Sequence, residues 1–308
     1  MTGTGRDIAP GAWALIGLLS LVWGTSFAAV AVALTGMGPL TAVLHRVFWA
    51  ALILVALAGA LGQRLPADPR VWGALAVMGL LNNALPFSLI AWAQTRVESG
   101  LAGILNASTA LFALPVAAAF FAEERLTARR VLGVLTGLAG VVLAIGPGSL
   151  AGLDPRALGQ VAVLGGALSY ACAAAWARAR LGGLHPVAAA AGMTLTAALM
   201  IAPVALAAEG LPRPDLPARV WAAVAWYAGA GTALAYLLYY RILALAGPAN
   251  LMLVTLAIPV VAVALGTLLM GEHLPARALA GFGLVALGLA IIDGRLARAI
   301  GLRAGRAP

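Results

Sequence analysis

The residues of this sequence that could bind a small molecule are polar and aromatic side chains that interrupt long apolar runs. An amide or hydroxyl in the middle of such a run costs on the order of a kcal/mol or more if it is buried without a hydrogen-bond partner. The partner could be a ligand or another helix, and hydrogen bonds between membrane helices average only about 0.6 kcal/mol. We predict that the residues nearest the middle of their runs bind a substrate; the alternative is that they only join helices. The residues predicted to bind the substrate are Trp23, Asn82, Asn83, Asn106, Ser169, Tyr170, Tyr236 and Thr255.

His45 and Arg46 lie about 9 Å from the nearer end of an apolar run, at a helical rise of about 1.5 Å per residue. An arginine at that depth either extends its side chain outward to the membrane surface or faces a wet interior. The outward arrangement is the expectation for Arg46, and coupling or gating of transport is the alternative role for both residues. The imidazole group of histidine ordinarily titrates near neutral pH, so His45 is the candidate for proton coupling.

The sequence lacks the motifs that several kinds of catalysis and metal binding require. The chain has no lysine, so it lacks the phosphate-binding Walker A loop and does not hydrolyse ATP itself. It contains no H-E-x-x-H or G-x-S-x-G motif, and His45, His185 and His273 are too dispersed to suggest a metal site. No Asp or Glu falls in the central part of an apolar run. We therefore expect no enzyme activity, no metal and no cofactor.

The composition indicates which elements position these residues. The chain has 308 residues, of which 63% are hydrophobic and 9% charged, and its mean hydropathy is +1.02. A water-soluble core of this size cannot bury so much apolar surface. The apolar runs match helices that cross a bilayer core of about 30 Å with about 20 residues each. We predict an all-α membrane protein with ten transmembrane helices, at residues 12–34, 40–61, 71–93, 99–122, 130–146, 157–178, 186–208, 219–241, 247–270 and 277–293.

The charges of the chain indicate its orientation in the membrane. They do not indicate a nucleic-acid partner. The net charge is +9, and all 19 basic residues are arginines that mostly flank the spans. If the N-terminus is cytoplasmic, 13 of them fall on the cytoplasmic side and five on the other, which is the positive-inside bias. We therefore expect both termini to be cytoplasmic, in the inner (plasma) membrane. The basic tail 294–308 is expected to bind the anionic cytoplasmic leaflet of the lipid bilayer.

The sequence contains an internal repeat. When the chain is shifted by 148 residues, residues 124–140 align without a gap with residues 272–288 and share six identities in seventeen positions. A unit of five spans crosses the membrane an odd number of times, so its second copy must have the opposite orientation. We expect a pseudo-two-fold axis in the membrane plane, with Glu124 and Glu272 on opposite faces.

The fifth and tenth spans differ from the others. They have almost nothing polar at mid-depth, and the fifth contains Gly133-x-x-x-Gly137, a motif for close helix packing. We expect these two spans to be scaffold or interface helices and not part of a binding site.

Four short segments are notable in addition to the repeat: Trp23-Gly24-Thr25, the run from Thr41 to Leu54, and the turns Glu124 to Leu126 and Gly271 to Leu274. Together with the repeat they resemble the EamA family of the drug/metabolite transporter superfamily, over nearly the whole chain. The resemblance implies two homologous five-helix halves, cytoplasmic termini and export of small metabolites, often amino acids. The chain departs from symmetry in having Met193 in the second half where the first half has Arg46.

We therefore expect a secondary transporter with repeat domains at 12–146 and 157–293, acting by alternating access at a midplane cavity. Its small-molecule substrate is expected to be neutral or zwitterionic, with amino acids and related compounds as the expected class. Four-helix multidrug exporters of the same superfamily resemble this chain but rely on a glutamate in the first helix, where residues 23–26 offer none. A lipophilic cation is therefore not expected. The alternative is a non-transporting membrane scaffold or a lipid-handling protein.

Overall fold

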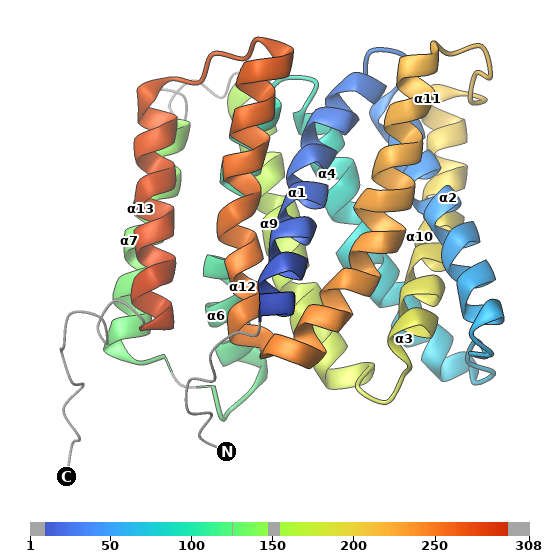
Figure 1. Cartoon of the computed structure of the whole chain (residues 1–308), viewed down its shortest axis with the longest axis horizontal. Helices are drawn as coiled ribbons and strands as arrows, with labels where there is room; N and C mark the ends of the chain where they lie inside the picture. The colour runs from blue at the N-terminus through green and yellow to red at the C-terminus, as the bar shows by residue number, and fades with distance from the viewer. Residues whose placement is uncertain (1–9, 125, 147–154, 295–308) are drawn as a thin grey trace.

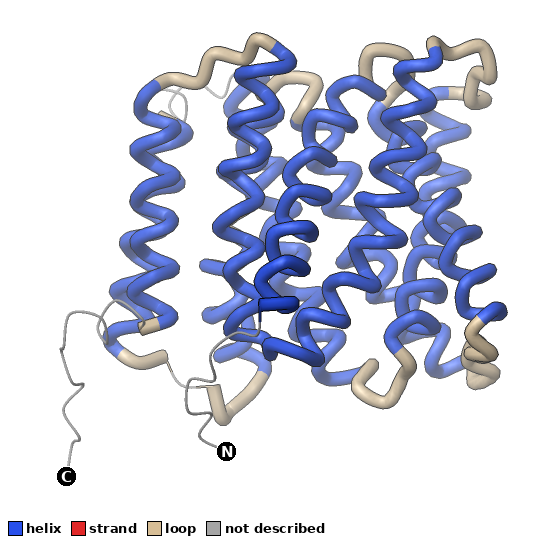
Figure 2. Tube along the Cα trace, in the orientation of Figure 1, coloured by secondary structure: helices blue, strands red, loops and turns tan. Residues whose placement is uncertain are grey.

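In the computed structural model, residues 10–124, 126–146 and 155–294 are described, and their regular structure is helical (Figures 1 and 2). The first half contains α1 (Pro10–Ala33), α2 (Pro39–Ala60), α3 (Pro69–Gly79), η1 (Leu80–Ala84), α4 (Leu85–Ala93), α5 (Ser99–Asn106), α6 (Thr109–Phe120) and α7 (Ala128–Ile145). The second half contains α9 (Pro155–Arg180), α10 (Pro186–Glu209), α11 (Ala218–Ala225), η2 (Trp226–Leu234), α12 (Ala235–Met270) and α13 (Ala276–Asp293).

These elements form ten spans that are long and apolar enough to cross a membrane, counted over the described residues. The prediction of ten transmembrane helices is confirmed, and the bounds differ from the expected ones by a few residues. The third span consists of α3, η1 and α4, and the fourth of α5 and α6, which are separated at Ala107 and Ser108. The eighth span, Ala218–Gly247, joins α11, η2 and the start of α12.

The two halves have opposite orientations. α1 begins and α13 ends at one face of the bundle, whereas α9, the first helix of the second half, begins at the opposite face (Figure 1). The turn that contains Glu124 lies at the first face, and the turn that contains Glu272 lies at the other. The molecule is therefore a pair of inverted five-helix repeats, as predicted.

α7 and α13, the last spans of the two halves, pack side by side at one end of the molecule (Figure 1). A Cβ atom built on Gly133 would lie 2.6 Å from the carbonyl oxygen of Gly288, and one built on Gly140 would lie 2.5 Å from that of Gly281. The 148-residue shift relates Gly133 to Gly281 and Gly140 to Gly288, so the two contacts are exchanged as they are around a two-fold axis. Glycine is needed here because only its lack of a side chain lets the backbones approach so closely.

The chain reverses direction inside α12. Gly247 has a φ of 76° and a ψ of 172°, a backbone conformation that residues other than glycine rarely adopt. The eighth span therefore ends at Gly247, and the ninth runs from Asn250 to Met270.

The third and eighth spans, which are the third of each half, both contain a π-helical segment near the middle of the span. η1 interrupts the third span and η2 interrupts the eighth. Such widened turns are rare and are frequently found at functional sites. They carry the polar residues Asn82, Asn83 and Thr232.

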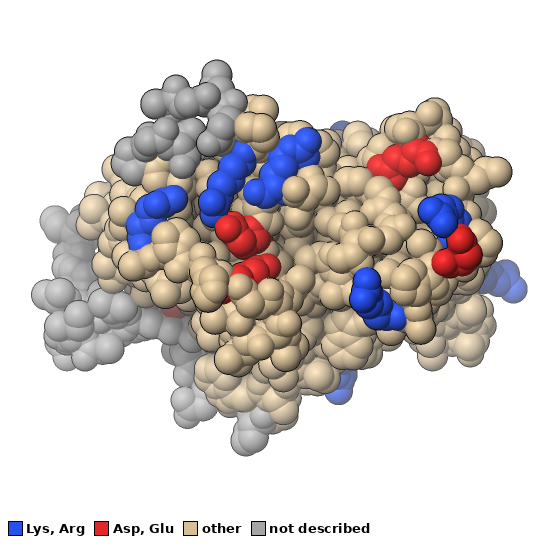
Figure 3. All heavy atoms as spheres, turned by 90° about the horizontal axis from the view of Figure 1, so that it is seen from above, with Lys and Arg blue, Asp and Glu red and all other residues tan. Residues whose placement is uncertain are grey.

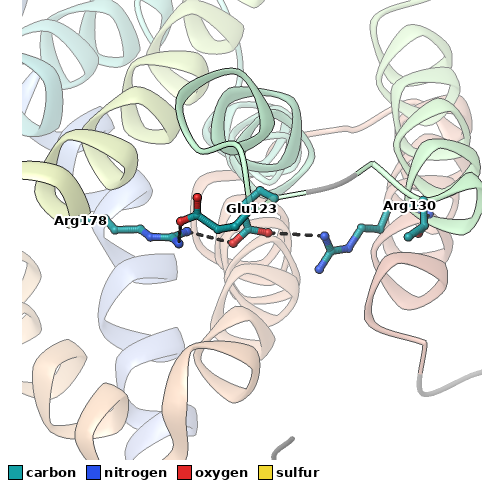
Figure 4. A network of polar contacts seen from close by, with 5 residues as sticks. Glu123, Arg130 and Arg178 are labelled. Atoms are coloured by element: carbon teal, nitrogen blue, oxygen red, sulfur yellow. Dashed lines mark hydrogen bonds and ion pairs between the residues drawn. The ribbon is translucent and has the colours of Figure 1, made fainter. Parts of the chain in front are cut away.

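Ion pairs hold together the helix ends at the face with the α6–α7 turn (Figure 4). Arg178, at the end of α9, donates to Glu124 Oε1 at 2.9 Å and to Glu123 Oε1 at 2.8 Å. Glu124 Oε2 lies 3.5 Å from Nη1 of Arg130 at the start of α7. Glu124 thus connects helices of both halves at this face.

The opposite face, seen in Figure 3, has basic and acidic side chains close to one another. Two glutamates of the second half bind the starts of helices in the first half. Each accepts two backbone N–H hydrogen bonds: Glu209 from Leu40 and Thr41 in α2, at 2.9 and 2.8 Å, and Glu272 from Ser99 and Gly100 in α5, at 2.7 and 2.9 Å. These contacts satisfy N–H groups that have no partner within their own helix.

Candidate functional site

A short chain of hydrogen bonds links the two halves in the middle of the third span. The Asn82 Nδ2 group donates to the Tyr236 hydroxyl at 3.0 Å, and this hydroxyl donates to Asn83 Oδ1 at 2.5 Å. Adjacent side chains diverge by about 100° on a regular α-helix, and the π-helical segment lets both asparagines reach one hydroxyl. Asn83 is 0% exposed, and its Nδ2 group has no partner among the described residues.

Ser169 and Tyr170 reach the same region from α9. Ser169 Oγ donates to the carbonyl oxygen of Leu81, inside η1, at 2.7 Å. The Tyr170 ring lies edge-on to the Phe87 ring of α4, with 6.4 Å between the ring centres. Both of these predicted residues therefore lie beside the asparagines of η1 and the start of α4.

Arg46 points into the bundle, so the expectation that it extends outward to the membrane surface is wrong. Its Nε donates to Thr232 Oγ1 at 2.9 Å, and its Nη2 lies 3.4 Å from the carbonyl oxygen of Gly231. The guanidinium carbon lies 3.8 Å from the centre of the Phe87 ring. The reason is that the interior offers a hydroxyl, a carbonyl and an aromatic face, which together replace water around the cation.

We call the group formed by Arg46, Asn82, Asn83, Ser169, Tyr170, Thr232 and Tyr236 the central cluster. Hydrogen bonds of this cluster join the first half of the chain to the second. Within the described residues, this holds for every hydrogen bond made by the side chains of Arg46, Asn82, Asn83, Ser169 and Tyr236. The cluster offers hydroxyls, amides and one guanidinium, and it contains no carboxylate. It can therefore recognise a small polar molecule by hydrogen bonds and by positive charge.

His45 lies apart from the central cluster. Its Nδ1 accepts a hydrogen bond from Trp49 Nε1 at 3.2 Å, and its ring lies edge-on to Trp221 with 5.3 Å between the ring centres. Both tryptophans line an apolar cavity of about 260 Å³ between α2 and α11. The His45 Nε2 atom is buried and has no partner within the described residues. A role for His45 in coupling stays a prediction.

Trp23, Asn106 and Thr255 form no hydrogen bond with the central cluster in the part of the chain that the structure describes. The Trp23 ring packs against Tyr239, with 6.1 Å between the ring centres. Asn106 ends α5, and its Oδ1 is buried without a partner among the described residues. Thr255 is half-buried on the ninth span. These three residues lie on α1, α5 and α12, which pack against one another.

Three residues that contact Arg46 were not predicted from the sequence: Thr232, Phe87 and Gly231. Thr232 is 1% exposed, accepts from Arg46, and donates to the Tyr227 carbonyl oxygen at 2.8 Å. As a polar residue near the middle of its span, it could have been found by the rule that selected the others. Phe87 and Gly231 have no such signal, because a phenylalanine or a glycine in an apolar run is most often a packing residue.

Several known proteins with similar sequences are named as transporters or exporters. The sequence pattern of the EamA-like transporter family matches residues 11–146 and 157–293, one match in each half. A protein of Archaeoglobus fulgidus named an uncharacterized transporter is 25% identical over 292 residues, which cover 91% of this chain and 98% of that protein. The uncharacterized inner membrane transporter YedA of Escherichia coli is 29% identical, over 87% of this chain and 86% of YedA.

Two further comparisons concern part of the chain and the fold. A probable terminal-alkyne amino-acid exporter of Streptantibioticus cattleyicolor is 31% identical over 44% of this chain and 45% of its own length. A solved crystal structure at 23% identity has the same fold, with a TM-score of 0.67 over 94% of this chain and 98% of that one. Because the family pattern matches both halves almost completely, this integral membrane protein belongs to the EamA-like transporter family.

Proposed function

We propose that the protein is a secondary exporter of small neutral or zwitterionic metabolites, with amino acids and related compounds as the favoured class. The observation that carries the proposal is the central cluster, where Arg46 and Asn82 of the first half meet Thr232 and Tyr236 of the second. In transporters built from inverted repeats, the substrate binds near the membrane midplane between the repeats. Movement of one repeat against the other then exposes the site to each side in turn.

The charge of the cluster supports this substrate class. An intramembrane carboxylate is the usual partner of a transported cation or proton. Among the residues that the structure describes, every Asp and Glu lies at a span end or in a turn. The similarity of 44% of the chain to a probable amino-acid exporter points in the same direction.

The inferred orientation of the protein rests on the arginine distribution. We infer cytoplasmic termini in the inner (plasma) membrane from the positive-inside bias, and the similarity to an inner membrane transporter agrees with this location. Binding of the tail to the anionic cytoplasmic leaflet remains part of the proposal, because residues 295–308 lie outside the described residues.

Counterflow in liposomes that contain the purified protein tests the proposal. We expect at least one of the common amino acids to accumulate faster than in protein-free liposomes. Tyr236→Phe removes the hydroxyl that binds both asparagines, so the half-saturation concentration should rise roughly fivefold, as for the loss of a hydrogen bond worth about 1 kcal/mol. Tyr240→Phe is the matched control, because the Tyr240 hydroxyl makes no hydrogen bond within the described residues.

Two results would contradict the proposal in different ways. Unchanged kinetics in Tyr236→Phe, in a protein that folds normally, would show that the site is wrongly placed. Absence of counterflow for amino acids, nucleosides and sugars alike would favour the scaffold or lipid-handling alternative.

A further inference from the structure

Among the residues that the structure describes, Arg46 has no anionic partner. Its neighbours are the Thr232 hydroxyl, the Gly231 carbonyl and the Phe87 ring. These neighbours stabilise the cation without neutralising it. Charged residues inside membrane proteins almost always pair with one another, bind backbone carbonyls or face a water-filled cavity, and they mark substrate pathways. An anionic group that arrives with the substrate would complete the environment of Arg46.

The guanidinium group retains the donors that such an anion needs. It has five N–H groups, of which the Nε group and one Nη2 group point at Thr232 and Gly231. Nη1 donates no hydrogen bond within the described residues, and the side chain is half-buried, not enclosed. The edge formed by Nη1 and Nη2 can bind a carboxylate by two parallel hydrogen bonds.

A second unused donor lies close by. The Nδ2 group of Asn83 is buried without a partner in the described part of the chain. Asn83 precedes Phe87, on which the Arg46 guanidinium rests, by four residues, a rise of roughly 6 Å along a helix. The cluster thus has unused donors on Arg46 and Asn83 and no carboxylate of its own.

We propose that Arg46 binds the carboxylate of the transported molecule, so that a carboxylate is required in the substrate and an amino group is not. Within the proposed class this selects zwitterions such as amino acids over neutral molecules, and it extends the class to the same acids without the amino group. No acidic side chain of the cluster is present to bind a substrate ammonium group. The inference rests on the proposed transport function.

Competition in counterflow with the full-length protein tests this inference. The labelled substrate is the amino acid with the largest counterflow, and four competitors share its side chain: the carboxamide, the methyl ester, the decarboxylated amine and the acid that lacks the amino group. We expect the acid to compete within about fivefold of the amino acid itself. The three compounds without a carboxylate should compete at least roughly tenfold more weakly, since they cannot form charge-assisted bidentate hydrogen bonds.

Three variants assign the preference to Arg46. Arg46→Met should abolish it, and methionine is chosen because Met193 lies seven residues after Pro186, the first residue of α10, as Arg46 lies seven residues after Pro39, the first residue of α2. Arg46→Lys should keep the preference with weaker binding, because an ammonium group supplies the charge without the planar fork. Arg241→Met is the matched control, because it removes the same charge from an exposed position on α12, and it should behave like the wild type.

Thermal melting of the same purified variants provides a readout that does not depend on transport, because a compound that binds only the folded protein raises its melting temperature. Equal competition by the amide and the ester, or a carboxylate preference that persists in Arg46→Met, would overturn this inference and leave transport intact. If no amino acid shows counterflow and no carboxylate shifts the melting temperature of the wild type, both the proposed function and the role of Arg46 are wrong.

Discussion

At the scale of single residues, the polar groups fall into two classes. The Tyr236 hydroxyl both donates and accepts within the protein. Asn83 Nδ2, Asn106 Oδ1 and His45 Nε2 are buried, and none has a partner among the described residues. Buried polar atoms without a partner are uncommon in folded proteins. The first class fixes how the halves meet, and the second consists of groups that a substrate or a water molecule would satisfy.

His45→Ala tests for proton coupling at this scale. The central cluster has no carboxylate and His45 lies outside it, so we expect counterflow to be indifferent to a pH gradient in the wild type and in His45→Ala. A pH-sensitive dye inside the liposomes measures this, and His273→Ala, at an exposed turn position, is the control. A substrate-driven pH change in the wild type that only His45→Ala abolishes would demonstrate coupling through His45.

At the scale of helices, equivalent glutamates of the two repeats make different contacts. Glu272 accepts two backbone N–H groups at the start of α5, whereas Glu124 pairs with Arg178 (Figure 4). One reason is that residue 248, which matches Gly100, is a proline and has no N–H group to donate. The two faces of the molecule are therefore held by different interactions, although the halves are repeats.

Replacement of Glu272 should destabilise the protein more than replacement of an exposed ion-pair residue. Glu272→Ala removes the capping bonds of α5 and should lower the free energy of unfolding by about 1–2 kcal/mol, observed as a lower melting temperature in detergent. Glu123→Ala loses only its exposed pair with Arg178, worth less than about 1 kcal/mol. Glu272→Gln should recover part of the loss, because its amide oxygen still accepts. Equal melting temperatures for the two alanine variants would contradict the capping role.

At the scale of the whole molecule, the repeat produces an approximate two-fold relation between the halves. The exchanged glycine contacts of α7 and α13 follow this relation. The central cluster departs from it, because Arg46 enters the cluster whereas Met193 is 1% exposed and accepts a contact from Asn82 at 3.9 Å. The positive charge of the site is therefore contributed by the first repeat alone.

Labelling of introduced cysteines tests the arrangement and orientation of the two repeats. Glu123→Cys and His273→Cys, each in a Cys172→Ser background, place thiols in the α6–α7 and α12–α13 turns, which lie on opposite faces (Figure 1). We expect an impermeant maleimide added to intact cells to label position 273, and position 123 only after permeabilisation. Labelling of both from one side would contradict the inverted repeats, and the reverse pattern would overturn the cytoplasmic location of the termini alone.

The sequence by itself determined the spans and their inversion. Hydropathy is a property of the chain, so the second span, expected at 40–61, is found at Pro39–Ala60. The inversion follows from the odd number of spans in each repeat. The residues Asn82, Asn83, Ser169, Tyr170 and Tyr236 could also be chosen from their depth, because an unpaired polar group in an apolar run must find a partner somewhere.

Only the tertiary structure decided which of these residues meet and where Arg46 points. The direction of a side chain is set by the helices packed around it, and no local pattern reveals that Phe87 and Gly231 would offer the guanidinium an aromatic face and a carbonyl. The π-helical segments η1 and η2 likewise change the register of their spans, so that both asparagines face Tyr236. For the same reason Trp23, Asn106 and Thr255, which share the depth of the cluster residues, lie outside the cluster: depth follows from sequence position, whereas proximity depends on how the helices pack.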